Sequence, residues 1–79
     1  MTNYQEYITT NPKICHGQLC FKDTRILVYI ILEALEAGET PEQILVSYPG
    51  LTKAHIQAAL HLAAEIIKTE EFFPLAEAR

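Results

Sequence analysis

Two helix starts separated by one short break constrain the fold of this chain more than any other sequence feature. Thr40 precedes Pro41 and lies three residues before Gln43, so it can cap a helix through a reciprocal capping box. Pro49–Gly50 ends that helix, and Thr52 can cap a longer one that begins at the next residue. A short helix, a tight turn and a longer helix are typical of a helix-turn-helix.

The segments upstream of Thr40 predict one more helix and a pair of strands. Apolar residues recur at helical spacing from Leu27 to Ala37, and Gly38 is placed to end that helix in the left-handed conformation. Residues 14–28 are rich in β-branched and aromatic side chains around a turn at 16–18, which indicates a short β-hairpin. We therefore expect a mainly α fold in which a short N-terminal β-hairpin precedes three helices.

The third helix combines a wide apolar arc with a polar face. At 100° per residue, one side carries Ile56, Leu60, Ala63 and Ile67, flanked by Ala59, Leu62 and Ile66. The opposite side carries Gln57, His61, Glu65 and Lys68, with Ala54 and Ala58 as small neighbours. In a helix-turn-helix the second helix can enter the major groove, so this polar face is the expected nucleic-acid-reading face.

The candidate DNA contacts lie on this face and near the hairpin. They are Lys53, Gln57, His61 and Lys68 on the third helix, with Lys22 and Arg25 at the hairpin exit. Arg25 can also tie the hairpin to a helix end, for example through Glu33, and we favour this structural role. The formal net charge of −4 opposes sequence-independent attraction to DNA. A DNA role therefore needs local geometry, dimerisation or a basic partner, and the same polar residues can equally form a solvated face.

Length and hydrophobicity predict one domain that associates with another chain. The chain has 79 residues, enough for a single core, and we divide it into an N-terminal arm (1–13), the hairpin and helix-turn-helix domain (14–68) and a C-terminal apolar tail (69–79). Because 49% of the residues are hydrophobic, some apolar side chains are expected to stay outside the core, which favours a homodimer or a protein partner. Phe72, Phe73 and Leu75 of the tail can pack on the third helix or on a second chain, and we favour the second chain.

The cysteines suggest neither a metal site nor an active site. Cys15, His16 and Cys20 lie close together, but a closed zinc site needs a fourth ligand, and the other histidines belong to a distant helix. Cys15 and His16 would point to opposite faces of a strand, which works against a thiol and base pair. We expect free thiols, no metal, no cofactor, no small-molecule substrate and no enzymatic activity. The N-terminus lacks a basic flank and an apolar run, and no stretch approaches the ~20 apolar residues of a membrane helix, so we expect a cytoplasmic protein without a membrane partner.

The order of several motifs resembles that of the bacterial domain-of-unknown-function family 433. The similar segments are Cys15–Ile26, Ile31–Leu32, Ala37–Gly38, Pro41–Leu45, Tyr48–Pro49, Leu51–Thr52 and Ala58–Leu60. The resemblance extends from Ile8 to about Glu65, which is most of the chain. This chain departs from the family pattern at Gln18, usually basic, at Leu19, usually proline, at Asp23, usually glycine, and at Leu62, usually tyrosine.

The resemblance implies a fold and a function. It implies a homeodomain-like or winged-helix-like fold, and many members resemble VapB-type antitoxins that neutralise a PIN-like ribonuclease toxin and bind their own operator DNA. We therefore expect an antitoxin-like homodimer whose tail lies against the toxin, with Phe72, Phe73, Leu75 and Arg79 as partner-binding candidates. Arg79 is a cation that can compete at the metal-binding carboxylates of a PIN-like site. The alternative is a small protein-interaction or adaptor module that does not bind DNA.

Overall fold

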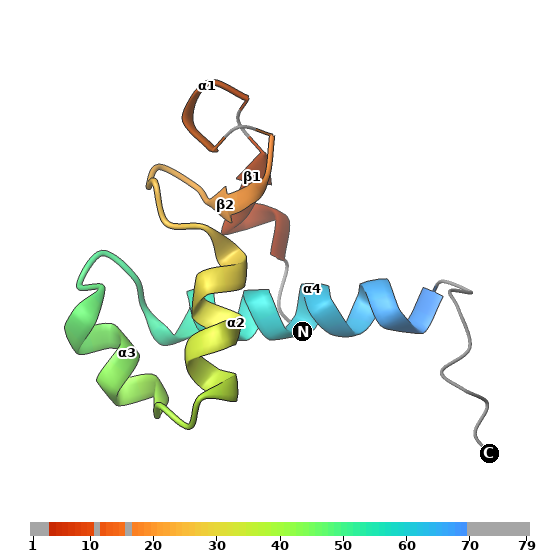
Figure 1. Cartoon of the computed structure of the whole chain (residues 1–79). Coiled ribbons are helices and arrows are strands. Elements are labelled where there is room, and N and C mark those ends of the chain that lie inside the picture. The colour runs from red at the N-terminus through yellow and green to blue at the C-terminus, as the bar shows by residue number, and fades with distance from the viewer. Residues whose placement is uncertain (1–3, 11, 16, 70–79) are drawn as a thin grey trace, which may run out of the picture.

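The structure, a computed structural model, contains a small two-stranded sheet and three principal helices (Figure 1), and it describes residues 4–10, 12–15 and 17–69. The elements in chain order are η1 (Tyr4–Glu6), β1 (Ile8–Thr10), α1 (Pro12–Cys15), β2 (Leu19–Phe21), α2 (Val28–Glu36), α3 (Pro41–Ser47) and α4 (Lys53–Thr69). The predicted fold class is therefore confirmed: a short N-terminal strand pair precedes three helices. The helix bounds agree with the expected ones within one or two residues.

One strand of the pair lies outside the range that the sequence predicted. β1 pairs antiparallel with β2, with Ile8 opposite Phe21 and Thr10 opposite Leu19. The first strand thus comes from residues that we assigned to an N-terminal arm, and Pro12–Cys15 forms a helical turn where we expected a strand. Ile8 explains the difference, because pairing at this register buries its side chain in the core. The expected strand pair exists, and β2 lies within residues 14–28 as predicted, but its partner β1 precedes that range.

The turn that we placed at residues 16–18 is present at its described residues Gly17 and Gln18, with Gly17 at a φ of 82°, and a second tight reversal follows β2. The Phe21 N–H donates to the Ile26 carbonyl at 3.0 Å, so the chain folds back on itself over the intervening residues. The Thr24 hydroxyl donates to the Phe21 carbonyl at 2.7 Å and accepts from the Ile26 N–H at 3.0 Å. Asp23 has a φ of 62°, a left-handed conformation that aspartate tolerates better than most residues. This turn directs the chain from β2 into α2.

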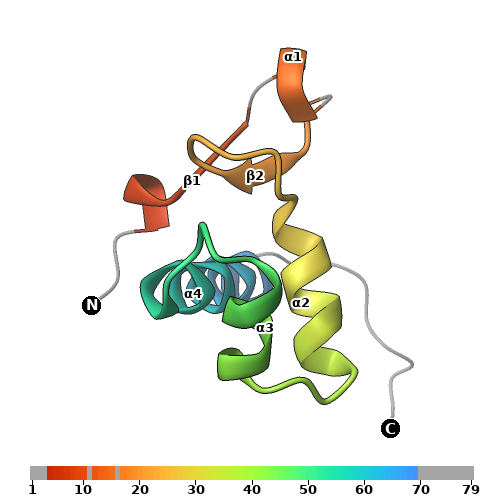
Figure 2. The ribbon, with the colours of Figure 1, turned by 90° about the vertical axis from the view of Figure 1, so that its left-hand side faces the viewer.

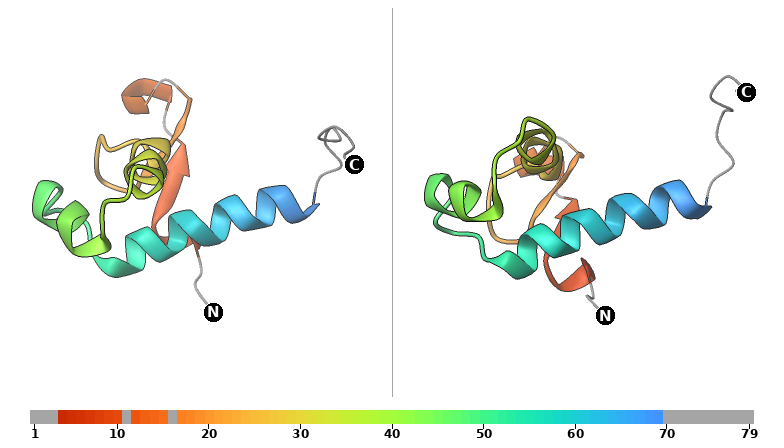
Figure 3. Two further views of the ribbon diagram at one scale, coloured as in Figure 1. Left: turned by 60° about the horizontal axis from the view of Figure 1, so that its bottom comes forward. Right: turned by 90° about the horizontal axis from the view of Figure 1, so that it is seen from below.

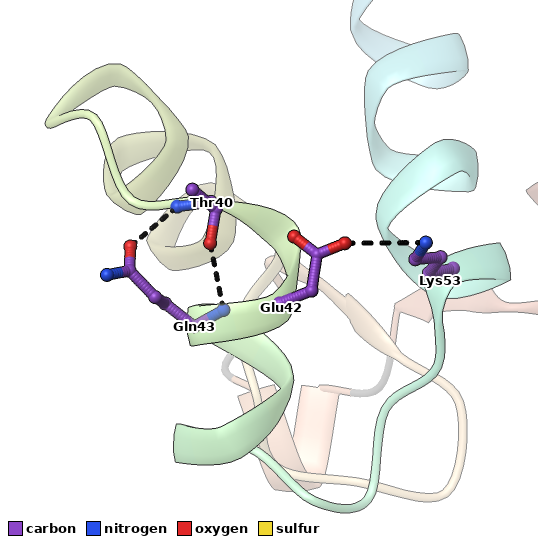
Figure 4. Close-up of polar contacts among 4 residues, drawn as sticks. All are labelled: Thr40, Glu42, Gln43 and Lys53. Atoms are coloured by element: carbon purple, nitrogen blue, oxygen red, sulfur yellow. Dashed lines mark hydrogen bonds and ion pairs between the residues drawn. The ribbon is translucent and has the colours of Figure 1, made fainter.

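The predicted caps position α3. The Thr40 hydroxyl accepts from the Gln43 N–H at 3.1 Å, and the Gln43 side-chain oxygen accepts from the Thr40 N–H at 2.8 Å (Figure 4). Pro41 occupies the first turn, as expected. At the end of α2, Gly38 has a φ of 98°, which closes that helix in the left-handed conformation. Local sequence therefore determines where α2 ends and where α3 begins.

One core joins the sheet to the helices. The largest fully buried side chains include Phe21 from β2, Ile31 from α2 and Ile44 from α3. α4 contributes its buried residues Ile56, Ala58 and Ala59 from its first half. Two views at right angles show α4 running beside both α2 and α3, with the sheet at one end of α2 (Figures 1 and 2). The second half of α4 extends past the other helices (Figures 1 and 3).

The buried side of α4 is rotated relative to the predicted arc. Leu60 and Ile67, which we placed on the apolar arc, are 48% and 64% exposed, whereas Ala58 is fully buried. The cause is the N-terminal segment, since both η1 and β1 contact α4. Their contact covers one side of α4 that we expected to face solvent, and Ala58 is small enough to allow close approach. Within the described residues, no helix is both long and apolar enough to cross a membrane.

Candidate functional site

An apolar groove lies between α2 and the second half of α4. α4 has 17 residues and α2 has 9, which correspond to about 26 Å and 14 Å of helix. α2 crosses α4 near the first half of α4, and the second half of α4 extends past this crossing, so its apolar side is uncovered there (Figures 1 and 3). The resulting groove has a volume of about 550 Å³. Its walls are Gly17, Gln18 and Leu19 before and in β2, Val28, Tyr29 and Leu32 on α2, and Ala59, Leu62, Ala63, Ile66 and Ile67 on α4.

The groove exposes large apolar side chains. Leu19 is 37% exposed, Tyr29 48%, Ile66 52% and Ile67 64%, and all four line the same groove. Ala59 is fully buried beneath it, so an occupant can approach α4 closely. Among the described residues that line the groove, Gln18 alone has an amide side chain and none is charged. A groove of this composition suits an apolar occupant rather than a charged one.

Our sequence analysis did not identify this groove, although its signal is present in the chain. The apolar residues of the third helix continue at helical spacing as far as Ile67, whereas the first two helices are short. A long apolar arc and short covering helices leave part of the arc uncovered. The sequence predicted that some apolar side chains stay outside the core, but we did not locate any of them in a groove between the first and third helices.

The expected nucleic-acid face is exposed at the start of α4, where an acidic side chain partly neutralises it. Lys53 and Gln57 lie one turn apart and both are exposed. The Lys53 ammonium lies 3.4 Å from the Glu42 carboxylate of α3 (Figure 4). Hydrogen bonding from its own backbone N–H, and then the contact with Lys53, lower the pKa of Glu42. Glu42 therefore remains charged at neutral pH beside the first cation of this face.

The structure places the other helix candidates apart from this pair. The His61 ring lies 5.7 Å from the Tyr4 ring of η1 and is partly buried, so it does not belong to an open polar stripe. Lys68 is exposed in the last turn of α4, with its ammonium 3.8 Å from the Glu65 carboxylate. Fifteen residues separate Lys68 from Lys53, which is about 22 Å along a helix. The predicted stripe is therefore reduced to Lys53 and Gln57 at one end and Lys68 at the other.

The remaining candidates lie in the loop after β2 or outside the described residues. Lys22 and Arg25 are both exposed in the segment that joins β2 to α2. Among the residues that the structure describes, no ion pair joins Arg25 to Glu33, and the role of Arg25 at a helix end stays a prediction. Phe72, Phe73, Leu75 and Arg79 lie outside the described residues.

His55 has a structural role that we did not predict. Its Nδ1 accepts from the Thr52 N–H at 3.0 Å and lies 3.0 Å from the Thr52 hydroxyl, so it caps the first turn of α4. The ring also meets Tyr7 and Phe21 edge-on, with centroid distances of 5.0 and 5.6 Å. Burial lowers the pKa of His55, which favours the neutral form that Nδ1 needs in order to accept. His55 thus joins the start of α4 to the strand region.

The cysteine segment shows no metal-binding arrangement where it can be described. Cys20 is buried in β2. The side chain of Cys15 and all of His16 lie outside the described part of the chain. Over residues 4–10, 12–15 and 17–69, no group of three or more His, Cys, Asp or Glu side chains is arranged to hold a metal ion.

Comparison with known proteins relates this architecture to one family. The family described as "Protein of unknown function (DUF433)" matches residues 8–63. The chain is also similar to the crystal structure of a DUF433 member protein from Anabaena variabilis, with 31% sequence identity and a TM-score of 0.73. That match covers 81% of this chain and 63% of the other, so this chain spans less than two thirds of that protein's length. Among curated proteins, none matches significantly. The family match extends from β1 through Ala63 and so includes parts of both helices that form the groove.

Proposed function

We propose that this chain, which belongs to the DUF433 family of proteins of unknown function, is an antitoxin-like protein. In this proposal it binds and neutralises a PIN-like ribonuclease toxin. The observation that carries the proposal is the apolar groove between α2 and α4. It places four partly exposed apolar residues, Leu19, Tyr29, Ile66 and Ile67, around one concave surface. Neutralising a protein requires a surface of this kind.

The groove supports a mechanism of occlusion rather than catalysis. A partner helix or loop that inserts apolar side chains into the groove would bury the Tyr29 ring and the ends of Ile66 and Ile67. Buried aromatic and apolar anchors at the centre of an interface account for most of its binding energy. The tail, with Phe72, Phe73, Leu75 and Arg79, follows α4 directly and would enlarge this interface. The bound toxin would then be unable to admit its RNA substrate.

Operator binding is a second part of the proposal, and the start of α4 supports it. Lys53 and Gln57 are exposed on the second helix of the helix-turn-helix, where major-groove contacts arise in this motif. The net charge of −4 and the Glu42–Lys53 ion pair both weaken attraction to phosphate. We therefore propose weak operator binding by the free protein, as a homodimer, and tighter binding by its complex with the toxin.

The alternative function is a protein-interaction module without a DNA role. The same groove supports it, because an apolar surface accepts any protein of complementary shape. The acidic net charge also favours it over a DNA-binding protein. The two candidates differ in the identity of the partner and in the response to DNA.

Co-expression with the product of the adjacent gene tests the proposal. If that product is a PIN-like ribonuclease, its expression alone should stop growth, and co-expression with this chain should restore growth and abolish RNA cleavage in vitro. Restored growth without a stable complex would contradict neutralisation by binding. A neighbouring product that has no nuclease activity but binds this chain would support the interaction module instead.

A further inference from the structure

We propose that residues 70–79 of this chain dock in its own α2–α4 groove and cover it when no partner is bound. The inference goes beyond partner binding, because it assigns an occupant to the groove of the free protein. It rests on the position of the groove, the sequence that follows α4 and the absence of charge in the groove lining.

The groove opens at the end of the chain's last helix. Ile66 and Ile67 form part of its α4 wall and lie in the last turn before Thr69, where α4 ends. The residues that follow include Phe72, Phe73 and Leu75. An apolar segment therefore begins immediately beside an apolar groove.

The chain length after α4 suits the distance to be covered. The α4 wall runs from Ala59 to Ile67, which is about 12 Å along a helix. Phe72 and Leu75 come three and six residues after Thr69, so an extended chain places them up to about 10 and 20 Å from the helix end. After reversing direction, the segment reaches the whole length of this wall.

The proline between these side chains favours a reversal over a continued helix. Pro74 disfavours the α conformation at the residue before it, so the helix is not expected to extend through Phe73. An extended segment can then present its apolar side chains to the groove. A groove of about 550 Å³ is within the range that accepts several large apolar groups.

Proximity favours this segment over a second copy of the chain. A tethered segment has an effective concentration in the millimolar range when its length matches the span. A second copy must reach that concentration in free solution, so at micromolar protein the tethered segment is favoured in the groove. Our sequence analysis favoured a second chain because the core needs no further apolar residues. The groove leaves Tyr29, Ile66 and Ile67 exposed beside that core, so this reason does not apply to it.

Docking of the segment would regulate partner binding. A partner that uses the groove must displace residues 70–79, so its apparent affinity falls by the fraction of molecules in which the groove is open. This consequence rests on the proposed function, whereas the docking itself does not. A test on the isolated full chain therefore separates the two.

Nuclear Overhauser contacts in the full-length protein test the docking directly. We expect contacts from the rings of Phe72 and Phe73 to the methyl groups of Leu19, Leu62 and Ile66. In a mixture of isotope-labelled and unlabelled chains, these contacts should occur within single molecules only. Absence of these contacts would overturn the proposal. Contacts between differently labelled molecules would also overturn it and would show that a second copy of the chain occupies the groove.

Paired substitutions give an independent measurement. Phe72→Ser together with Phe73→Ser should open the groove and increase the fluorescence of a bound apolar dye such as anilinonaphthalene sulfonate several-fold. Glu70→Ser together with Glu71→Ser is the matched control in the same segment, and it should leave dye binding unchanged. Equal dye binding by the wild type and the phenylalanine variant would show that the segment does not cover the groove.

Discussion

Replacing His55 is expected to destabilise the fold through two contacts that one side chain makes. In His55→Ala, the Thr52 N–H loses its Nδ1 acceptor at 3.0 Å, so the first turn of α4 loses its side-chain cap. The same substitution removes the edge-on ring contacts with Tyr7 and Phe21. These contacts connect α4 with the strand region, so their loss weakens the packing of the N-terminal segment as well as the helix end.

The expected magnitude follows from these two contributions. Loss of a helix cap costs about 0.5–2 kcal/mol, and each aromatic pair contributes about 0.5–1.5 kcal/mol beyond its buried area. The ring is partly exposed, so we expect the lower half of the sum, about 1–3 kcal/mol. For a domain of this size, 1 kcal/mol shifts Tm by about 4–8 °C. His55→Gln keeps a side-chain acceptor and should recover only the capping contribution.

Thermal and urea unfolding followed by circular dichroism at neutral pH measure this effect. Gln57→Ala is the control, because Gln57 is exposed on the same helix and its replacement should change stability by less than about 0.5 kcal/mol. The order of Tm should be wild type, then His55→Gln, then His55→Ala. Equal Tm values for His55→Ala and Gln57→Ala would refute the structural role of His55.

Three further substitutions or conditions test other parts of the structure. Burial depresses the folded-state pKa of His55 below its ordinary value of 6.5, so the free energy of unfolding should be largest above pH 6.5 and fall as the pH is lowered through the folded-state pKa. Urea titrations across this pH range should show this fall for the wild type and not for His55→Gln. Because φ is 62° at position 23, Asp23→Val should destabilise the protein by at least about 1 kcal/mol, whereas Asp23→Gly should not. Equal losses in the free energy of unfolding, measured in urea, would contradict the left-handed turn at this position. If α4 binds operator DNA, Lys53→Ala should reduce the slope of log affinity against log salt concentration by ~1, and Glu42→Gln should strengthen DNA binding. Unchanged DNA affinities of both variants in salt titrations would exclude the start of α4 as a DNA-binding surface.

Local signals in the sequence predicted the helices well. The reciprocal bonds of Thr40 and Gln43, the proline that follows Thr40 and the left-handed Gly38 each depend on residues within a few positions of one another. Their side chains can satisfy the helix ends whatever the rest of the chain does. The positions of α2, α3 and α4 therefore followed from the sequence to within one or two residues.

The strands and the groove depend on contacts between distant segments. Ile8 pairs with Phe21 across an intervening helical turn, and no pattern near Ile8 specifies that partner. The burial of Ala58 and the exposure of Leu60 depend on where η1 and β1 pack against α4, which helical periodicity alone does not determine. The groove arises where α4 extends past its crossing with α2, so it could be recognised only once the helices were placed together.

Binding of the adjacent-gene product by matched variants tests the central claim most directly, namely that the α2–α4 groove binds the toxin. Ile66 lies in the groove, whereas Val46 is 82% exposed in the last turn of α3 and does not line it. Ile66→Asp and Val46→Asp therefore introduce the same charge at an exposed apolar position near the end of a helix. We predict by calorimetry that Ile66→Asp weakens binding at least tenfold while Val46→Asp leaves it unchanged. No binding by the wild type, or equal affinities for the two variants, would contradict the proposed function of the groove.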